Sequence, residues 1–318
     1  MNLSKKILSW YDNNQRTLPW RISENSKNNQ YYRLISEFML QQTQVKTVIP
    51  YFNNFVKNIP NLKTLSKCSE KKVLKLWEGL GYYKRVKNLH KTSKILIKKY
   101  KGNIPDSFEK LKDLPGIGDY TANILLALIY NQARIGIDGN VKRVLFRLFD
   151  KDIPNLINLF KTKRNNKLAE ALIEFGALIC KPKDPKCNEC KINSMCLYYK
   201  SELKIEPRKK IKIKLKSYDI FCYLKKNKKQ IALTKNNSVG FLKEFNLPKI
   251  QTTSKKVKNW KFLCNFKKSI SNKKLNINLY YKFSSRIPRK YNWHSLNKSN
   301  DFIPTFTKKI FRQVSHLY

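Results

Sequence analysis

Apolar side chains recur every three to four residues through about the first 200 residues of the chain. The pattern is clear at residues 34–39, 73–77 and 125–129. This period predicts amphipathic helices, and stretches that contain glycine or proline, such as residues 114–118, separate them. We therefore expect a mainly helical domain over residues 1–200 with short connections.

The pattern changes after a charged stretch, residues 201–216, which contains Pro207 and reads as a basic linker. Beyond it, short runs rich in Ile, Phe and Tyr are bounded by Lys and Asn clusters, which is typical of strands. These runs predict a small α+β domain over residues 217–318, with strands near residues 218–224, 230–234, 260–266 and 275–283.

Charge narrows the choice of partner. The chain has 67 basic and 21 acidic residues, a formal net charge of +46, and residues 217–318 alone hold 23 basic and three acidic residues. Such an excess favours nucleic acid as the partner. A base-biased genome that over-uses Lys and Asn is the alternative explanation. At 41% hydrophobic residues, the chain is too apolar for wholesale disorder.

Neither the first ten residues nor the longest apolar run, residues 124–130, has the length of a signal peptide or a membrane span. We therefore expect a cytoplasmic protein that does not associate with membranes. Four of the seven cysteines form a C-x6-C-x2-C-x5-C cluster, which predicts one metal centre, either structural zinc or an iron–sulfur cluster. They are Cys180, Cys187, Cys190 and Cys196.

Two further features carry chemistry. Leu114-Pro115-Gly116-Ile117-Gly118 predicts a tight hairpin between helices, either a phosphate-binding turn or an ordinary one.

The second feature is a pair of carboxylates, Glu37 and Asp138. Glu37 lies among apolar helical residues, where burial raises the pKa of a carboxyl group and makes it suitable as a general acid. Asp138 precedes a helix at residues 142–149, whose N-terminus stabilises a carboxylate. Such a pair can cleave a glycosidic bond; alternatively Asp138 is a simple N-cap and Glu37 an ion-paired or solvated helix residue.

Five motifs together with the cysteine spacing resemble the adenine DNA glycosylases of the MutY family. In chain order they are LPW (18–20), SEFMLQQTQV (36–45), LWEGLGYY (76–83), LPGIG (114–118) and DGNVKRV (138–144). The resemblance implies a helix-hairpin-helix glycosylase domain whose four cysteines bind a 4Fe-4S cluster in a loop over residues 180–196.

The resemblance also implies roles for individual residues. Glu37 would protonate adenine at N7, and Asp138 would stabilise the oxocarbenium ion, with Tyr120 and Asn140 supporting these two. The residues implied to contact DNA or the extruded adenine are Leu40, Gln42, Tyr82, Gly116, Gly118, Trp20, Arg21 and Glu170.

The C-terminal domain resembles, more distantly, the Nudix-like domain with which these enzymes recognise 8-oxoguanine. Residues 239–248 are similar to its G-x-W-x-F-P region without the tryptophan, and residues 313–316 to its Phe-Ser-His loop with Val in place of Phe. This implies that Ser315 and His316 face the lesion. Because the chain ends at Tyr318, we expect an incomplete domain.

The sequence thus predicts a bacterial, monomeric, monofunctional DNA glycosylase that acts at the nucleoid. It would remove adenine opposite 8-oxoguanine or guanine in double-stranded DNA. One alternative is a bifunctional glycosylase/lyase of the endonuclease III type. That enzyme needs an amine nucleophile where this chain has Tyr120, and a phenol cannot form a Schiff base. The other alternative is a non-catalytic DNA-binding module.

Overall fold

The computed structural model divides the chain into two compact units. One comprises Met1–Val73 with Lys84–Lys209, and the other Leu74–Tyr83 with Lys210–Tyr318. The structure describes residues 3–149, 162–201, 215–235, 242, 245–253, 257, 259–270, 273–297 and 303–318, so nearly all of the predicted linker lies outside the described residues.

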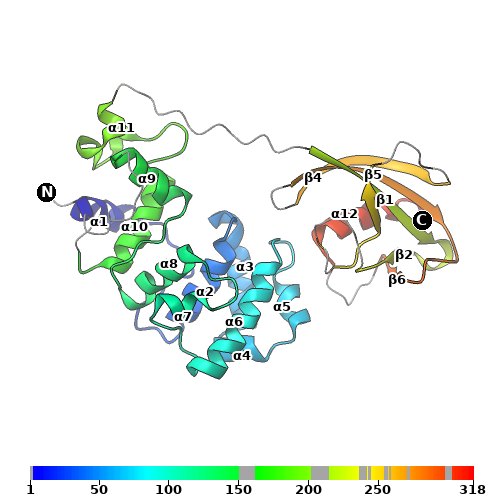
Figure 1. Ribbon diagram of the computed structural model, residues 1–318, viewed down its shortest axis with the longest axis horizontal. Helices are drawn as coiled ribbons and strands as arrows, with labels where there is room; N and C mark the ends of the chain where they lie inside the picture. Colours follow the sequence, from blue (N-terminus) through cyan, green and yellow to red (C-terminus); the bar gives the residue numbers. More distant parts are fainter. Residues whose placement is uncertain are drawn as a thin grey trace. The chain divides into compact units, whose positions relative to one another are not determined.

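The described part of residues 3–201 is helical, as its hydrophobic period predicts (Figure 1). None of the described helices is both long enough and apolar enough to span a membrane. The α-helices are α1 (Leu3–Asn14), α2 (Asn29–Leu40), α3 (Val45–Asn58), α4 (Leu62–Lys67), α5 (Glu70–Leu76), α6 (Lys84–Tyr100), α7 (Phe108–Lys112), α8 (Asp119–Tyr130), α9 (Gly139–Phe149), α10 (Asn165–Leu178) and α11 (Leu197–Lys200).

Helix α2 ends at Leu40 because an arginine from α6 takes up its last carbonyl groups. A helix leaves its final carbonyls without partners inside the helix. Nη1 of the buried Arg85 lies 2.6 Å from the Met39 carbonyl oxygen and 2.5 Å from that of Gln41. Gln42 then adopts a left-handed backbone with φ of 56°. The chain therefore turns sharply here and begins α3 three residues later.

The predicted hairpin joins α7 to α8. Gly116 has φ of +85°, and a Cβ atom there would lie only 2.8 Å from Phe38 and from Asn88. Both the left-handed backbone and the close packing therefore require glycine at this position. Gly118 is the N-cap of α8, and Lys112 forms an ion pair with Asp119 at the hairpin exit.

Helix α10 packs against α1, α8 and α9. A core of buried residues from α1, α9 and α10 includes Tyr11, Val144, Leu172 and Phe175, and the cysteine segment packs against it. A Cβ atom on Gly176 would lie 2.7 Å from Cβ of Asn140. Glycine at this position therefore lets the start of α9 approach α10 closely.

The second unit contains a mixed sheet with strand order β4-β5-β1-β2-β6, and β3 also pairs with β1 (Figure 1). Strands β1 and β5 are parallel and the other pairs antiparallel. The four predicted strands are present, and β3, β6 and α12 were not anticipated. The elements are β1 (Leu215–Lys225), β2 (Gln230–Leu233), β3 (Lys249–Thr252), β4 (Lys261–Ile270), β5 (Lys273–Phe283), β6 (Asn292–Ser295) and α12 (Thr305–Ser315).

The interpretation of residues 313–316 as a loop is wrong, because Gln313, Val314 and Ser315 lie in helix α12 and His316 is its C-cap. Val314 is fully buried in the core between α12 and the sheet, so it cannot stack on a base. The Ser315 hydroxyl donates to the Phe311 carbonyl, one turn earlier. Helical period outweighs the resemblance here, since Phe306, Ile310 and Val314 share one apolar face.

Candidate active site

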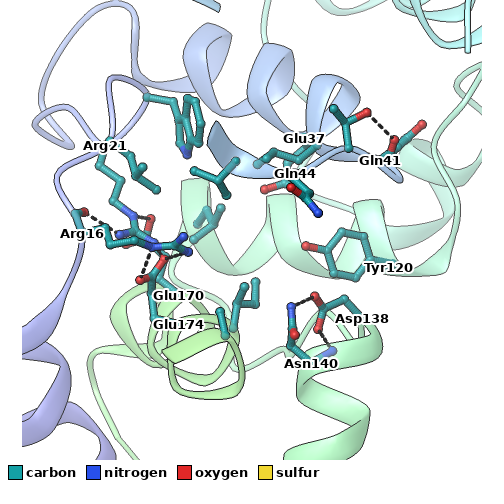
Figure 2. Close-up of a pocket in the computed structure, with 18 of the residues that line it drawn as sticks. Arg16, Arg21, Glu37, Gln41, Gln44, Tyr120, Asp138, Asn140, Glu170 and Glu174 are labelled. Carbon is teal, nitrogen blue, oxygen red and sulfur yellow. Dashed lines mark hydrogen bonds and ion pairs between the residues drawn. The ribbon is translucent and has the colours of Figure 1, made fainter. Parts of the chain in front are cut away.

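A cavity of about 820 Å³ opens in the helical unit between α2, α8, α9 and α10 (Figure 2). It is lined by nine of the residues that the sequence singled out, which come from segments up to 150 residues apart. These are Trp20, Arg21, Glu37, Leu40, Gln42, Tyr120, Asp138, Asn140 and Glu170.

Glu37 lies on α2 and is buried, with 6% of its surface exposed. Its Oε2 atom has no hydrogen-bond partner among the residues that the structure describes. Burial raises the pKa of the Glu37 carboxyl to about 7, which the nearby Arg33 and a hydrogen bond from Tyr120 only partly oppose. At neutral pH a large fraction of this carboxyl therefore carries a proton that it can donate into the cavity.

Tyr120, in the first turn of α8, lies between the two predicted catalytic carboxylates (Figure 2). Burial, and after it the negative charges of Glu37 and Asp138, raise the pKa of its hydroxyl. Tyr120 therefore stays a neutral phenol that donates a hydrogen bond to Glu37 and does not act as a base.

Asp138 is held at the start of α9 by three N–H groups. Its Oδ1 accepts from the backbone amides of Asn140 at 2.9 Å and Val141 at 2.7 Å, and its Oδ2 from Nδ2 of Asn140 at 2.9 Å. Asn140 is fixed in turn, because Arg143 Nη2 donates to its Oδ1 at 2.9 Å and to the Gly176 carbonyl at 2.7 Å. Asp138 is thus an N-cap that also faces the cavity, so the two readings of its sequence position are compatible.

The opposite end of the cavity is an ionic network (Figure 2). Oε1 of Glu170 accepts from Arg33 Nη1 at 2.5 Å and Arg21 Nε at 3.0 Å, while Oε2 accepts from the Tyr11 hydroxyl at 2.8 Å. Glu174 binds Arg16 through both of its oxygens and Arg21 through one. Although burial acts to raise it, the pKa of Glu170 is lowered, because Arg33 and Arg21 stabilise its charge.

Sequence reasoning missed Arg33, which is 3% exposed and lies one turn before Glu37 on α2. Residues four apart on a helix share a face, so the positive charge of Arg33 lies near Glu37. This charge acts to lower the pKa of both Glu37 and Glu170. Its Nε has no partner within the described part of the chain. The sequence signal that could have identified Arg33 is its position directly before the apolar segment 34–39.

The remaining predicted residues lie elsewhere. Gly116 and Gly118 belong to the hairpin, where the Gly116 carbonyl accepts from Gln41 Nε2 at 3.2 Å. Tyr82, Ser315 and His316 do not line the cavity and belong to the other compact unit. Of the predicted G-x-W-x-F-P counterpart, half of the residues, 239–241, 243 and 244, lie outside the described ranges.

All four clustered cysteines line one small cavity next to Arg147, and none forms a disulfide. Arg147 Nη1 lies 3.4 Å from the Cys180 sulfur, and the Cys196 thiol lies 3.3 Å from the Arg147 carbonyl oxygen. Among the described residues, no three His, Cys, Asp or Glu side chains are arranged to hold a single metal ion. Four thiols around one cavity are nevertheless the donor set that an iron–sulfur cluster requires.

The fold and the cavity define a class of protein. Residues 35–154 match the family model described as HhH-GPD superfamily base excision DNA repair protein. A solved structure titled a thermostable thymine-DNA glycosylase covers 62% of this chain and 94% of its own, with a TM-score of 0.56 and 25% identity. An endonuclease III–DNA complex covers 62% and 92%, with a TM-score of 0.51 and 21% identity. The helical unit therefore has the helix-hairpin-helix glycosylase fold.

Sequence relatives narrow this class. The adenine DNA glycosylase of Buchnera aphidicola subsp. Baizongia pistaciae is 37% identical over 97% of this chain and 95% of its own length. That of Homo sapiens is 36% identical over 60% of this chain and 38% of its own. The chain belongs to the adenine DNA glycosylase family.

Proposed function

We propose that this chain hydrolyses the N-glycosidic bond of adenine mispaired with 8-oxoguanine or guanine in double-stranded DNA. The observation that carries the proposal is the cavity shared by Glu37, Tyr120 and Asp138, in which one carboxyl has a raised pKa and the other is fixed at a helix N-terminus. An adenine inside a duplex is inaccessible to these groups, so the base must be extruded into the cavity.

Glu37 in its protonated form donates to N7 of the extruded adenine while the C1′–N9 bond breaks and the bond electrons leave with the base. The Asp138 carboxylate balances the positive charge that develops on the sugar. The ionised Glu37 then takes a proton from water as its oxygen attacks C1′, which regenerates the acid. Tyr120 orients Glu37, and Asn140 with Arg143 orients Asp138.

The remaining cavity residues would hold the base and the flanking duplex. Leu40 is the last residue of α2 and Gln42 lies in the turn that follows, while Trp20 and Arg21 lie at the ionic end. The Glu170 carboxylate already accepts three hydrogen bonds from protein donors, so it has limited capacity to accept another from the base. It would therefore form part of the wall of the adenine pocket. The hairpin with Gly116 and Gly118 would bind a phosphate, and Tyr82 would wedge into the duplex.

The sheet unit would carry the preference for 8-oxoguanine. A Nudix-like role for it stays a proposal, and Ser315 with His316 can contribute only from the exposed end of helix α12. The decisive assay uses duplexes that carry adenine opposite 8-oxoguanine, guanine, cytosine and thymine under single-turnover conditions. Release confined to the first two supports the proposal, and equal release from all four contradicts it.

Cys180, Cys187, Cys190 and Cys196 would hold a 4Fe-4S cluster, which supplies no proton or nucleophile and ties the segment into one loop. Anaerobically purified protein should contain close to four iron per chain, and Cys190→Ser should lose iron together with DNA affinity. Stoichiometric zinc without iron in a fully active preparation would contradict this assignment.

The monofunctional reaction is tested by borohydride trapping. Because Tyr120 offers no amine, little covalent complex should form, and the product strands should stay intact until they are heated in alkali. Lys46 is the one lysine that lines the cavity among the described residues. Efficient trapping that disappears in Lys46→Gln would therefore establish lyase chemistry.

A further inference from the structure

The sheet of the second unit has two faces of opposite character. Helix α12 lies against one face of the sheet (Figure 1). On this face, alternate residues of β1 and β5 pack against α12 in an apolar core. That core includes Ile220, Leu224, Leu279 and Ile310, each with no exposed surface. Side chains alternate along a strand, so the intervening residues project from the opposite face.

A row of aromatic rings crosses three strands on this opposite face. The register places Phe221 of β1 beside Tyr280 of β5, and Tyr280 beside Phe262 of β4. The Phe221 and Tyr280 rings are stacked with centroids 5.4 Å apart, and the Phe262 and Tyr280 centroids lie 5.6 Å apart. Phe262, at the end of the row, is 58% exposed, so its ring is accessible to a ligand.

Trp260 extends the row along the sheet. Its ring lies 4.9 Å from that of Phe221 and 4.8 Å from that of Tyr223. Trp260 ends the eight-residue connection between β3 and β4, whose described residues contain no helix. Among the described residues of 215–318, α12 is the only α-helix, and it lies on the other face.

Lysines accompany the rings. Lys249 lies over Phe221 at 5.5 Å, and Lys282 lies over both Tyr223 at 5.1 Å and Trp260 at 4.9 Å. By the same alternation, Lys267 of β4 and Lys274 of β5 project from this face as well. Lys267 pairs with Asn276, which lies two residues after Lys274 on β5. These cations are attracted to the rings and also leave the surface strongly positive.

The negative charge on this face is small. Among the described residues, its only carboxylate is Asp219, which is fully buried and accepts a hydrogen bond from Asn278 Nδ2 at 2.8 Å. A hydrophobic protein partner would have to desolvate the lysines, whereas a polyanion would be attracted to them. The positive charge of this face therefore favours a polyanion as the partner, and the row of aromatic rings favours a polyanion that carries flat aromatic groups.

Single-stranded nucleic acid meets both conditions, because its bases stack on aromatic side chains while its phosphates contact cations. A paired duplex offers no free base faces to such a row. We propose that this sheet face, carrying Phe262, Tyr280 and Trp260 with Lys249 and Lys282, is a binding platform for single-stranded DNA. It is separate from the cavity that would hold the extruded adenine.

The test uses the full-length protein and a fluorescein-labelled oligodeoxythymidylate of about 15 nucleotides. An unlabelled duplex with an abasic-site analogue is kept at saturation, so that the glycosylase cavity is occupied. Anisotropy then reports binding elsewhere. Phe262→Ala and Tyr280→Ala should each weaken binding by about tenfold, while Phe262→Tyr should retain most of it, since it keeps the ring.

Phe283→Ala is the matched control, because Phe283 is 41% exposed but packs against Tyr281 and Tyr318. It should leave binding unchanged, and all variants should release adenine from duplex within about twofold of the parent rate. The proposal is overturned if Phe262→Ala binds as the parent does, if Phe283→Ala loses as much, or if a fully paired labelled duplex shows the same dependence on Phe262. Stronger binding of oligouridylate with that dependence would assign the face to RNA instead.

Discussion

Two buried glutamates line the same cavity, yet the pKa values of their carboxyl groups move in opposite directions. Burial raises that of Glu37 to about 7, whereas the arginines around Glu170 lower its pKa despite similar burial. The difference lies in the partners. Glu170 accepts three hydrogen bonds, two of them from guanidinium groups, while Oε2 of Glu37 has no partner among the described residues.

Burial alone therefore does not decide what a carboxyl does. At the Glu170 end of the cavity, both carboxylates are paired with arginines, and this ionic network holds α10 against the segment containing Arg16 and Arg21. The Glu37 end keeps an unsatisfied acid whose proton is available to a ligand. Such unsatisfied groups cost stability, and they are retained where a reaction needs them.

The largest effect should come from the acid itself. Glu37→Gln keeps the shape but cannot deliver a proton, so single-turnover release of adenine should fall by about 10²- to 10⁴-fold. Binding to a mismatched duplex should be nearly unchanged in a gel-shift assay. Loss of binding in parallel with activity would make Glu37 a structural residue.

Asp138→Asn separates the two roles of this side chain. Asparagine also caps helices well, so the melting temperature should change little. The rate should nevertheless fall by about 10²-fold, because the charge that stabilises the cationic sugar is gone. An unchanged rate would leave Asp138 as a cap alone. Asp12→Asn, which removes an exposed ion pair with Arg164, is the control.

The contrast between the two glutamates predicts stability changes of opposite sign. Glu170→Gln leaves Arg33 and Arg21 buried beside a neutral group, which should cost about 3 kcal/mol. Because its folded pKa is lowered, the stability that Glu170 contributes is present above its unfolded pKa and is lost as the pH falls. Urea denaturation at several pH values measures both effects.

Glu37 behaves in the opposite way. Its folded pKa is raised from 4.5 to about 7, so the folded state binds more protons and stability declines as the pH rises between these values. Glu37→Gln should therefore be more stable than the parent by up to about 3 kcal/mol at pH 8, with the difference disappearing below about pH 4.5. Destabilisation at pH 8 would show that Glu37 has partners that compensate its burial.

The smallest effect concerns Arg33. Its cation opposes the rise in the pKa of Glu37, so Arg33→Met should shift the alkaline limb of the rate profile to higher pH by about half a unit to one unit. Arg33→Lys keeps the charge and should leave the limb near its original position. A fall in rate without any shift of the limb would reduce Arg33 to a packing role.

The helical and α+β regions could be predicted from the sequence, because the hydrophobic period indicates which side of an element is buried. The sequence also singled out Glu37, Asp138 and the four cysteines, because each lies in a short segment with a distinctive residue pattern. The structure places Glu37 and Asp138 in one cavity and the four cysteines in another, and their roles stay predictions. The expectation of a raised Glu37 pKa followed from its apolar neighbours and agrees with the structure. The expectation of a loop at residues 313–316 was wrong, because it rested on a short motif match and did not take the helical spacing of Phe306, Ile310 and Val314 into account.

The different properties of the acidic residues in the cavity depend on contacts between distant segments of the chain. Arg16, Arg21 and Arg33 reach Glu170 and Glu174 across as many as 158 residues of sequence, and Gly176 allows Asn140 to sit against α10. The aromatic row on the sheet likewise depends on strand register between residues 221, 262 and 280. The interactions that shift a side-chain pKa and those that stack two rings weaken within a few ångströms. They therefore depend on distances in space, which the order of residues does not give directly.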